Sequence, residues 1–130
     1  MSYEDILYTE KDGVATITIN RPDKYNAFRA QTVEELISAF NKAAWNKEIG
    51  VVVLTGAGDK AFCTGGDQSS HEGGYDGRGI VGLPVDELHT IIRDIAKPVI
   101  ARVQGFAIGG GNVLAVLADL TIASENAVFG

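Results

Sequence analysis

The first half of the chain shows two hydrophobic patterns, one with the period of a strand and one with the period of a helix. Tyr3–Glu10 and Val14–Asn20 (VATITIN) are predicted strands, and Lys11-Asp12-Gly13 between them is a turn signal, so the two strands should pair as a hairpin. A helix is predicted next, because Thr32 and Glu35 have the spacing of a capping box. Its apolar face, at helical spacing, consists of Val33, Leu36, Ile37, Phe40 and Ala44.

The remainder of the chain alternates strand and helix patterns. Val51–Thr55 is a continuous β-branched run, typical of a strand buried on both faces, and the short apolar segment Ala61–Cys63 follows. Thr64–Pro84 is a predicted loop, and a loop of this length in a compact domain is more often functional than idle. The later predicted elements are a helix at Val85–Ile95, a strand at Val99–Val103, a glycine-rich turn at Gly105–Gly111, a helix at Asn112–Ala118, and strands at Leu120–Ala123 and Ala127–Phe129. Strands that alternate with helices predict an α/β fold.

Composition narrows the class of protein. The 130 residues are 45% hydrophobic and 22% charged, as in an ordinary globular domain. A net charge of −6 without a basic stripe argues against nucleic acid or an anionic membrane as a partner. The single cysteine, Cys63, cannot form an intrachain disulfide, and neither a secretory signal nor a membrane-length apolar run is visible. We therefore expect a cytoplasmic protein.

Glycine is in excess, with 16 residues, and most of them lie between Gly65 and Gly111. Two glycine-rich segments, Ala61–Asp67 and Gly105–Gly111, each contain or follow a predicted strand, and the second leads into a helix. Glycine allows backbone N–H groups to approach a ligand closely, and a helix start supplies unpaired N–H donors. If the loops converge, they form an oxyanion hole that stabilises negative charge on a carbonyl oxygen. The alternative is two turns that need glycine for local reasons.

A second glycine pattern has a different interpretation. Gly56-x-Gly58-x-x-Ala61 follows a β-branched strand with the spacing of a dinucleotide-binding fingerprint. That fingerprint needs a helix that opens at the glycines, and the residues that follow carry no helical stripe. A tight turn is therefore favoured, and an NAD-binding domain is the least favoured function.

Four motifs resemble, in order and spacing, those of the crotonase (enoyl-CoA hydratase/isomerase) superfamily. They are Asn20-Arg21-Pro22 through Asn26-Ala27, AFCTGGD, GFAIGGGNVLA and ADLTIAS. The resemblance runs along the whole chain and implies a crotonase-like spiral of ββα units, of which residues 1–130 would be the N-terminal half. It implies that the C-terminal half is absent here, including the helices that build trimers or hexamers. The segments GGDQ and GGGNVL are most similar to two branches, the 2-ketocyclohexanecarboxyl-CoA hydrolases and the 1,4-dihydroxy-2-naphthoyl-CoA synthases. The segment DGRGIVGLPVDELHTIIRD resembles the hydrolases more closely, as does Asn112.

The resemblance also implies roles for individual residues. The amides of Gly66 and Gly110 would be the two oxyanion-hole donors for the thioester oxygen of a CoA substrate, and Tyr75 would contact that substrate. The other residues expected to line the acyl group or CoA are Lys24, Tyr25, Thr64, Gly65, Asp67, Gln68, Phe106, Ala107, Ile108 and Gly109. The alternatives are a solvated charge for Lys24 and an exposed loop side chain for Tyr75. CoA would enter as part of the substrate, with no tightly bound cofactor and no metal.

Val113 departs from the family pattern, since it stands where the hydratases carry a glutamate. Valine cannot give or take a proton, so the pair of carboxylates that alkene hydration needs would be incomplete. What remains is stabilisation of a thioester enolate, which serves cleavage of a C–C bond or closure of a ring. Two further alternatives stay open: a truncated chain that binds CoA thioesters or self-associates without catalysis, and an enoyl-CoA hydratase or isomerase.

Four other side chains have plainer interpretations. Cys63 is interpreted as a small apolar strand residue rather than a nucleophile, because no histidine lies at a sequence spacing that indicates a catalytic Cys–His pair. His71 and His89 are interpreted as surface histidines, since two histidines without a ligand pattern do not indicate a metal. Trp45 is expected to pack at the end of the first helix.

Overall fold

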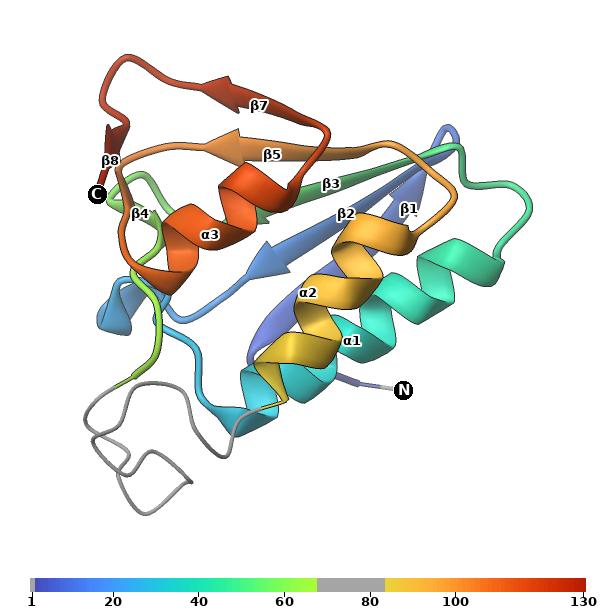
Figure 1. The fold of residues 1–130 in the computed structure, drawn as a ribbon, viewed down its shortest axis with the longest axis horizontal. Helices are drawn as coiled ribbons and strands as arrows, with labels where there is room; N and C mark the ends of the chain where they lie inside the picture. Colours follow the sequence, from blue (N-terminus) through green and yellow to red (C-terminus); the bar gives the residue numbers. More distant parts are fainter. Residues whose placement is uncertain (1, 68–83) are drawn as a thin grey trace.

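The computed structural model describes residues 2–67 and 84–130, which form two β-sheets and a layer of helices (Figure 1). The large sheet has the order β1-β2-β3-β5-β7, with strands at Ile6–Lys11, Val14–Ile19, Val51–Gly56, Val99–Val103 and Leu120–Ala123. The small sheet has the order β4-β6-β8, with strands at Ala61–Cys63, Phe106–Ala107 and Val128–Phe129. The helices are α1 (Ala30–Trp45), α2 (Val85–Asp94) and α3 (Gly110–Leu117), and the 3₁₀ turn η1 covers Pro22–Lys24.

The elements repeat along the chain as a strand of the large sheet, a strand of the small sheet and a helix. β3, β4 and α2 form one such unit, and β5, β6 and α3 form the next. Strands β1 and β2 are antiparallel, whereas the later neighbours in both sheets are parallel. The predicted α/β fold is confirmed, and the repeat is the ββα unit that the family resemblance implies.

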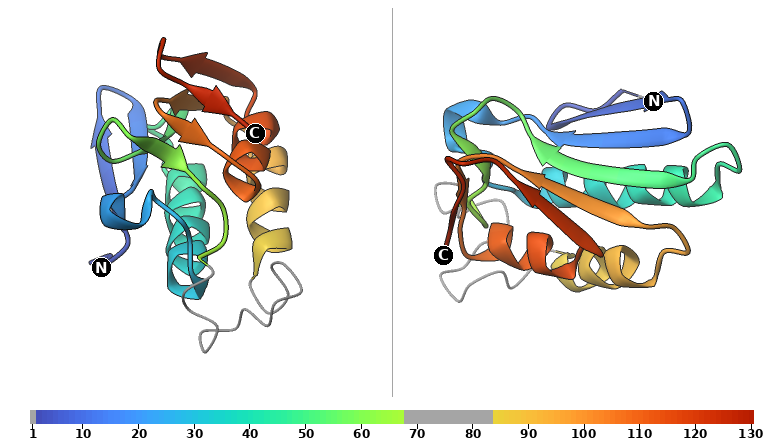
Figure 2. Two further views of the ribbon diagram at one scale, coloured as in Figure 1. Left: turned by 90° about the vertical axis from the view of Figure 1, so that its left-hand side faces the viewer. Right: turned by 90° about the horizontal axis from the view of Figure 1, so that it is seen from above.

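The helices lie on one face of the large sheet, and the core fills the space between (Figure 2). Ala15, Ile17 and Ile19 of β2 are fully buried on this face, because successive side chains of a strand point to opposite faces. Val51 and Val53 of β3 point to the other face and are only half-buried. The expectation that this strand is buried on both faces is therefore wrong, since the described helices cover one face only.

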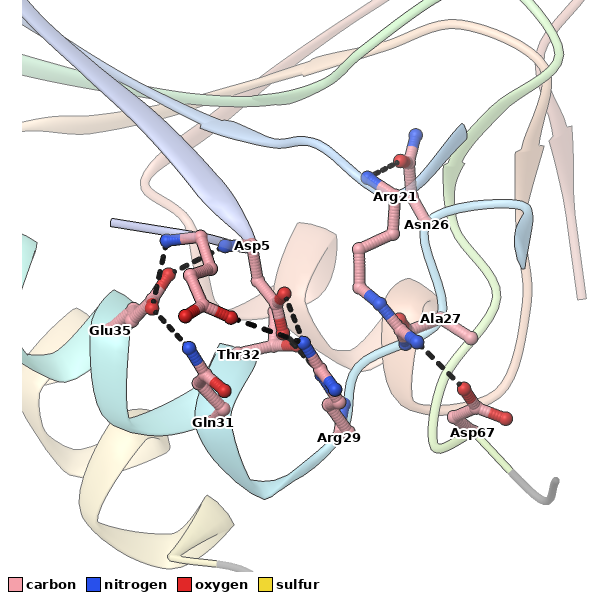
Figure 3. A network of polar contacts seen from close by, with 10 residues as sticks. Asp5, Arg21, Asn26, Ala27, Arg29, Gln31, Thr32, Glu35 and Asp67 are labelled. Carbon is pink, nitrogen blue, oxygen red and sulfur yellow. Dashed lines mark hydrogen bonds and ion pairs between the residues drawn. The ribbon is translucent and has the colours of Figure 1, made fainter. Parts of the chain in front are cut away.

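The start of α1 differs from its prediction, because the two capping side chains have other partners (Figure 3). Thr32 Oγ1 accepts the amide of Arg29 at 3.1 Å and donates to Asp5 Oδ2 at 2.6 Å. The Glu35 carboxylate accepts the amides of Glu4 and Asp5. The predicted Thr32–Glu35 capping box is wrong, because α1 begins at Ala30 with Arg29 as its N-cap, which makes Thr32 the third residue of the helix.

Four smaller predictions also need correction. Helix α3 begins at Gly110 rather than Asn112, and β6 lies inside the segment predicted as a glycine-rich turn. Trp45 is 85% exposed, so it does not pack against the end of α1. His89 is half-buried rather than on the surface. Two-residue β6 is held by its pairing with distant β4, which no local pattern reveals.

Candidate functional site

The two glycine-rich loops leave the small sheet together. β4 and β6 pair in parallel, so the chain leaves both strands at the same edge of the sheet. A Cβ atom placed on Gly65 would lie 3.1 Å from the amide nitrogen of Gly110 and 3.4 Å from the carbonyl oxygen of Ile108. The two loops therefore converge, with backbone against backbone.

The close approach of the two loops requires glycine residues, which have no side chain. Gly65 has φ +92° and Gly109 has φ +56°, which is the left-handed region that disfavours side chains. A Cβ atom on Gly111 would lie 1.9 Å from the carbonyl oxygen of Cys63, which is closer than any side chain can pack. A larger residue at Gly65 or Gly111 would press the loops apart, and one at Gly109 would strain the backbone.

At the contact, the amides of Gly66 and Gly110 donate no hydrogen bond to any described residue. Phe28 bonds on either side of Gly66: its amide donates to the Gly65 carbonyl at 2.8 Å, and its carbonyl accepts the Asp67 amide at 2.8 Å. Gly110 is the first residue of α3, whose first amides have no partner within the helix and carry the positive end of its dipole. One N–H group from each loop is thus left for an acceptor outside the described residues.

Phe28 lies beneath this junction and was not singled out by sequence reasoning. Its side chain is 1% exposed, and a Cβ atom on Gly110 would lie 2.9 Å from its ring. Its backbone flanks Gly66, so one residue supports both loops. The only signal for it in the sequence is its place directly after the Asn26-Ala27 motif.

A buried ion pair ties the segment after β2 to the first loop (Figure 3). Arg21 Nη2 lies 3.0 Å from Asp67 Oδ2, and the two side chains are only 12% and 7% exposed. Arg21 Nη1 also donates to the carbonyl of Ala27. Asp67 was expected to line the acyl group, and the structure directs its carboxylate toward Arg21. Arg21 was noticed only as part of a motif, so its contact with this loop was missed.

Tyr25 and Phe106 form an aromatic pair beside the loops. Their ring centroids are 6.5 Å apart in an edge-to-face arrangement, and the side chains are 48% and 43% exposed. Thr64 Oγ1 donates to the carbonyl of Tyr25 at 3.1 Å, which joins the pair to the first loop. Lys24 is exposed, and its ammonium contacts no acceptor among the described residues.

Two cavities border this part of the molecule. One of about 490 Å³ is lined by the aromatic pair together with Lys60 and Asn126. Another of about 330 Å³ lies between η1 and the turn after β3, with Asn26 and Lys60 in its wall. A larger cavity of about 610 Å³ lies on the outer face of the large sheet, and neither glycine-rich loop contributes to its lining.

The remaining expected residues contribute through their backbone or lie elsewhere. Ala107 is fully buried, and half-buried Ile108 donates its amide to the Cys63 carbonyl at 3.1 Å. Gln68 and Tyr75 lie outside the described residues, as does His71.

The ionisable and metal-binding side chains near the loops are few. Burial raises the pKa of the Cys63 thiol to about 12, so it stays protonated, in agreement with an apolar strand residue. Val113, in the first turn of α3, is 42% exposed. In the part of the chain that the structure describes, no group of three or more His, Cys, Asp or Glu side chains is placed to hold a metal ion.

None of the helices within residues 2–67 and 84–130 is long and apolar enough to cross a membrane.

The dinucleotide-binding alternative, which the sequence disfavours, lacks the helix that it needs. After Gly56 and Gly58 the chain enters strand β4 and not a helix, so no helix N-terminus faces these glycines. Gly56 is instead packed tightly, because a Cβ atom there would lie 2.3 Å from the carbonyl oxygen of Phe62.

Comparison with known proteins gives one consistent result. The family model described as enoyl-CoA hydratase/isomerase matches residues 9–130. An enoyl-CoA hydratase/carnithine racemase from Magnetospirillum magneticum is similar, with TM-score 0.88 and 30% identity, over 99% of this chain and 49% of its own. A putative enoyl-CoA hydratase/isomerase from Acinetobacter baumannii has TM-score 0.88 and 30% identity, over 99% of this chain and 53% of its own. A putative enoyl-CoA hydratase/isomerase from Legionella pneumophila has TM-score 0.85 and 33% identity, over 98% of this chain and 51% of its own. The chain thus spans about half the length of these proteins.

Proposed function

The chain belongs to the enoyl-CoA hydratase/isomerase (crotonase) superfamily, and on that premise we propose that it binds an acyl-CoA thioester and stabilises its enolate. The observation that carries the proposal is the contact between Gly65 and Gly110, because it brings together the amides of Gly66 and Gly110, neither of which bonds to a described residue. Two N–H donors and the positive end of α3 would stabilise negative charge on the thioester oxygen.

The reaction we propose breaks or forms a C–C bond next to the thioester. In ring opening, water adds to a ring ketone, the bond from that carbon to the thioester α-carbon breaks, and its electron pair becomes the enolate. The α-carbon then takes up a proton, and the former ketone carbon becomes a carboxylate. In ring closure the enolate attacks a carboxyl carbon and water leaves. These are the reactions of the hydrolase and synthase branches that the sequence resembles.

Alkene hydration is not favoured. It needs a carboxylate beside the second loop, and the first turn of α3 presents the aliphatic side chain of Val113 there. Enolate stabilisation needs only the backbone amides, and a valine at position 113 leaves these amides in place.

The other expected residues complete the proposal. Thr64, Gly65 and the second loop would border the acyl group, with Gln68 and Tyr75 as further contacts. Tyr25 and Phe106, with Lys24 nearby, would contact the CoA portion from the aromatic side of the loops. CoA would arrive with the substrate, and the complete enzyme would be a trimer or hexamer.

A difference titration with acetoacetyl-CoA, whose enolate absorbs in the near ultraviolet, tests the site. We expect a saturable enolate band, which Gly110→Pro should abolish because proline removes the amide donor. Loss of one such donor typically costs a factor on the order of 10²–10³ in rate. Gly110→Ala is the control, since it brings the same Cβ atom toward Phe28 but retains the N–H group. A folded wild-type protein without the band, or a folded proline variant with a full band, contradicts the proposal.

A second candidate function is binding of CoA thioesters, or self-association, without catalysis. It is favoured by exposed apolar side chains on β7 and β8, namely Leu120, Ile122, Val128 and Phe129, which are 43–55% exposed. Saturable CoA binding without an enolate band would support this candidate over the first.

A further inference from the structure

We propose that Arg21 is a positioning residue for the Gly66 amide, and that it acts through its buried ion pair with Asp67. This inference rests on the proposed function, because it assigns a supporting residue to the same oxyanion hole. Arg21 itself touches neither substrate nor the donor amide.

Gly66 cannot be held by a side chain of its own, so its neighbours must fix its orientation. Asp67 follows it directly and makes two contacts with the residues that the structure describes: its amide donates to the Phe28 carbonyl at 2.8 Å, and its carboxylate pairs with Arg21 at 3.0 Å. On the other side, the Gly65 carbonyl accepts the Phe28 amide at 2.8 Å. Of these three contacts, the ion pair is the one made by side chains, and it can be altered by substitution.

Arg21 is in turn held by its own surroundings. Its amide donates to Asn26 Oδ1 at 2.9 Å, and its Nη1 donates to the carbonyl of Ala27. Asn26 is fully buried, and its side-chain amide donates to the carbonyls of Ala57 and Ala61 at 3.0 and 2.7 Å. Ala61 opens the strand that leads into the first loop.

The first loop is therefore anchored near both ends by one segment. Asn26 holds its entry at Ala61, and Arg21 holds its exit at Asp67. Without the guanidinium, a carboxylate that is only 7% exposed would lose the cation that it pairs with in the described part of the chain, and its position would change. The Gly66 amide shares its peptide plane with the Gly65 carbonyl, which Phe28 holds, and Asp67 fixes the other side of Gly66, so a shift of Asp67 would tilt this amide from its place.

The test compares Arg21→Gln with a matched substitution, Arg29→Gln. Arg29 also pairs with a buried carboxylate, Asp5, at 2.8 Å, but that pair joins the start of α1 to the segment before β1 (Figure 3). Arg21→Gln should weaken the acetoacetyl-CoA enolate band roughly tenfold, which is less than deletion of a donor costs. Affinity for free CoA, which has no thioester carbonyl, should stay unchanged. Arg29→Gln should lower the melting temperature and keep the band.

The outcomes separate this inference from the proposed function. A wild-type protein without the band contradicts the function itself. The positioning role is overturned if folded Arg21→Gln gives the same enolate band as the wild-type protein. It is also overturned if Arg29→Gln weakens the band as much as Arg21→Gln does. If Arg21→Gln does not fold, Arg21→Lys decides: it keeps the charge but not the forked geometry, and should give a band between wild type and none. An unchanged band in the lysine variant overturns the inference.

Discussion

At the scale of single residues, close backbone contacts and buried polar groups set the geometry of the two loops. Gly111 meets the Cys63 carbonyl at a distance that admits no Cβ atom, and a Cβ atom on Gly65 would lie only 3.1 Å from the amide nitrogen of Gly110. Buried polar side chains then fix the backbone, as Asn26 does with three hydrogen bonds. Apart from the amides of Gly66 and Gly110, these residues contribute no group to the proposed chemistry, so their substitution would change the shape of the site.

His89 gives a prediction about pH at this scale. Its Nε2 atom is buried without a hydrogen-bond partner among the described residues, and burial lowers the pKa of the imidazole below its ordinary 6.5. The unfolded chain then binds a proton more readily than the folded protein. The contribution to stability is complete above about pH 6.5 and is lost as the pH falls below that value toward the folded pKa.

Thermal melting between about pH 7.5 and about pH 5.5 checks this prediction. Over this interval the melting temperature of the wild-type protein should fall further than that of His89→Leu, because leucine cannot titrate. Parallel curves for the two proteins would show that His89 is solvated in the native state.

At the scale of elements, α1 is held at its end by a residue from a distant segment. Lys97 lies between α2 and β5, and its Nζ atom donates to the carbonyls of Ala43 and Asn46 at 2.7 and 2.6 Å. These carbonyls belong to the last turn of the helix and its C-cap, where a cation also meets the negative end of the helix dipole.

Lys97→Met should lower the free energy of unfolding by about 1–2 kcal/mol, since it removes charge-assisted hydrogen bonds and keeps most of the apolar side chain. Urea denaturation measures the effect. Lys47→Met, an exposed lysine at the same end of the helix, is the control and should change little. Equal losses in the two variants would mean that charge alone, and not the contact of Lys97, is responsible.

The elements also show what the sequence could and could not predict. β2 and β5 were predicted within a residue or matched outright, because their β-branched runs are local signals. Thr32 was misassigned because Asp5, distant in sequence, accepts its hydroxyl. The two glycine-rich loops were predictable as a pair from their places after strands. The Arg21–Asp67 ion pair was not, because it depends on how β2 and β4 are placed in space.

At the scale of the whole molecule, the far edge of the large sheet is apolar and uncovered by described residues. Every residue of β7 is exposed, including Leu120 and Ile122, and Val116 on α3 is 76% exposed. Apolar surface gathered at a sheet edge marks an association site more often than a solvated face.

We expect the purified protein to self-associate through this edge. Sedimentation should give a mass above that of one chain, and Ile122→Lys should reduce it by placing a charge on the buried side of the contact. Trp45→Lys is the control, because Trp45 is 85% exposed at the end of α1, away from β7. A monomeric wild-type protein, or equal dissociation by both variants, would contradict the prediction.

The order β1-β2-β3-β5-β7 has a consequence for synthesis on the ribosome. Each strand of the large sheet adds to the one made before it in that sheet, so the spatial order repeats the order of translation. Long-range parallel pairing is slow in a complete chain, because the ends of a long loop must meet. In a nascent chain the edge that a strand needs is already in place when that strand emerges. We therefore expect this sheet to grow from one side only, with β2 as its template.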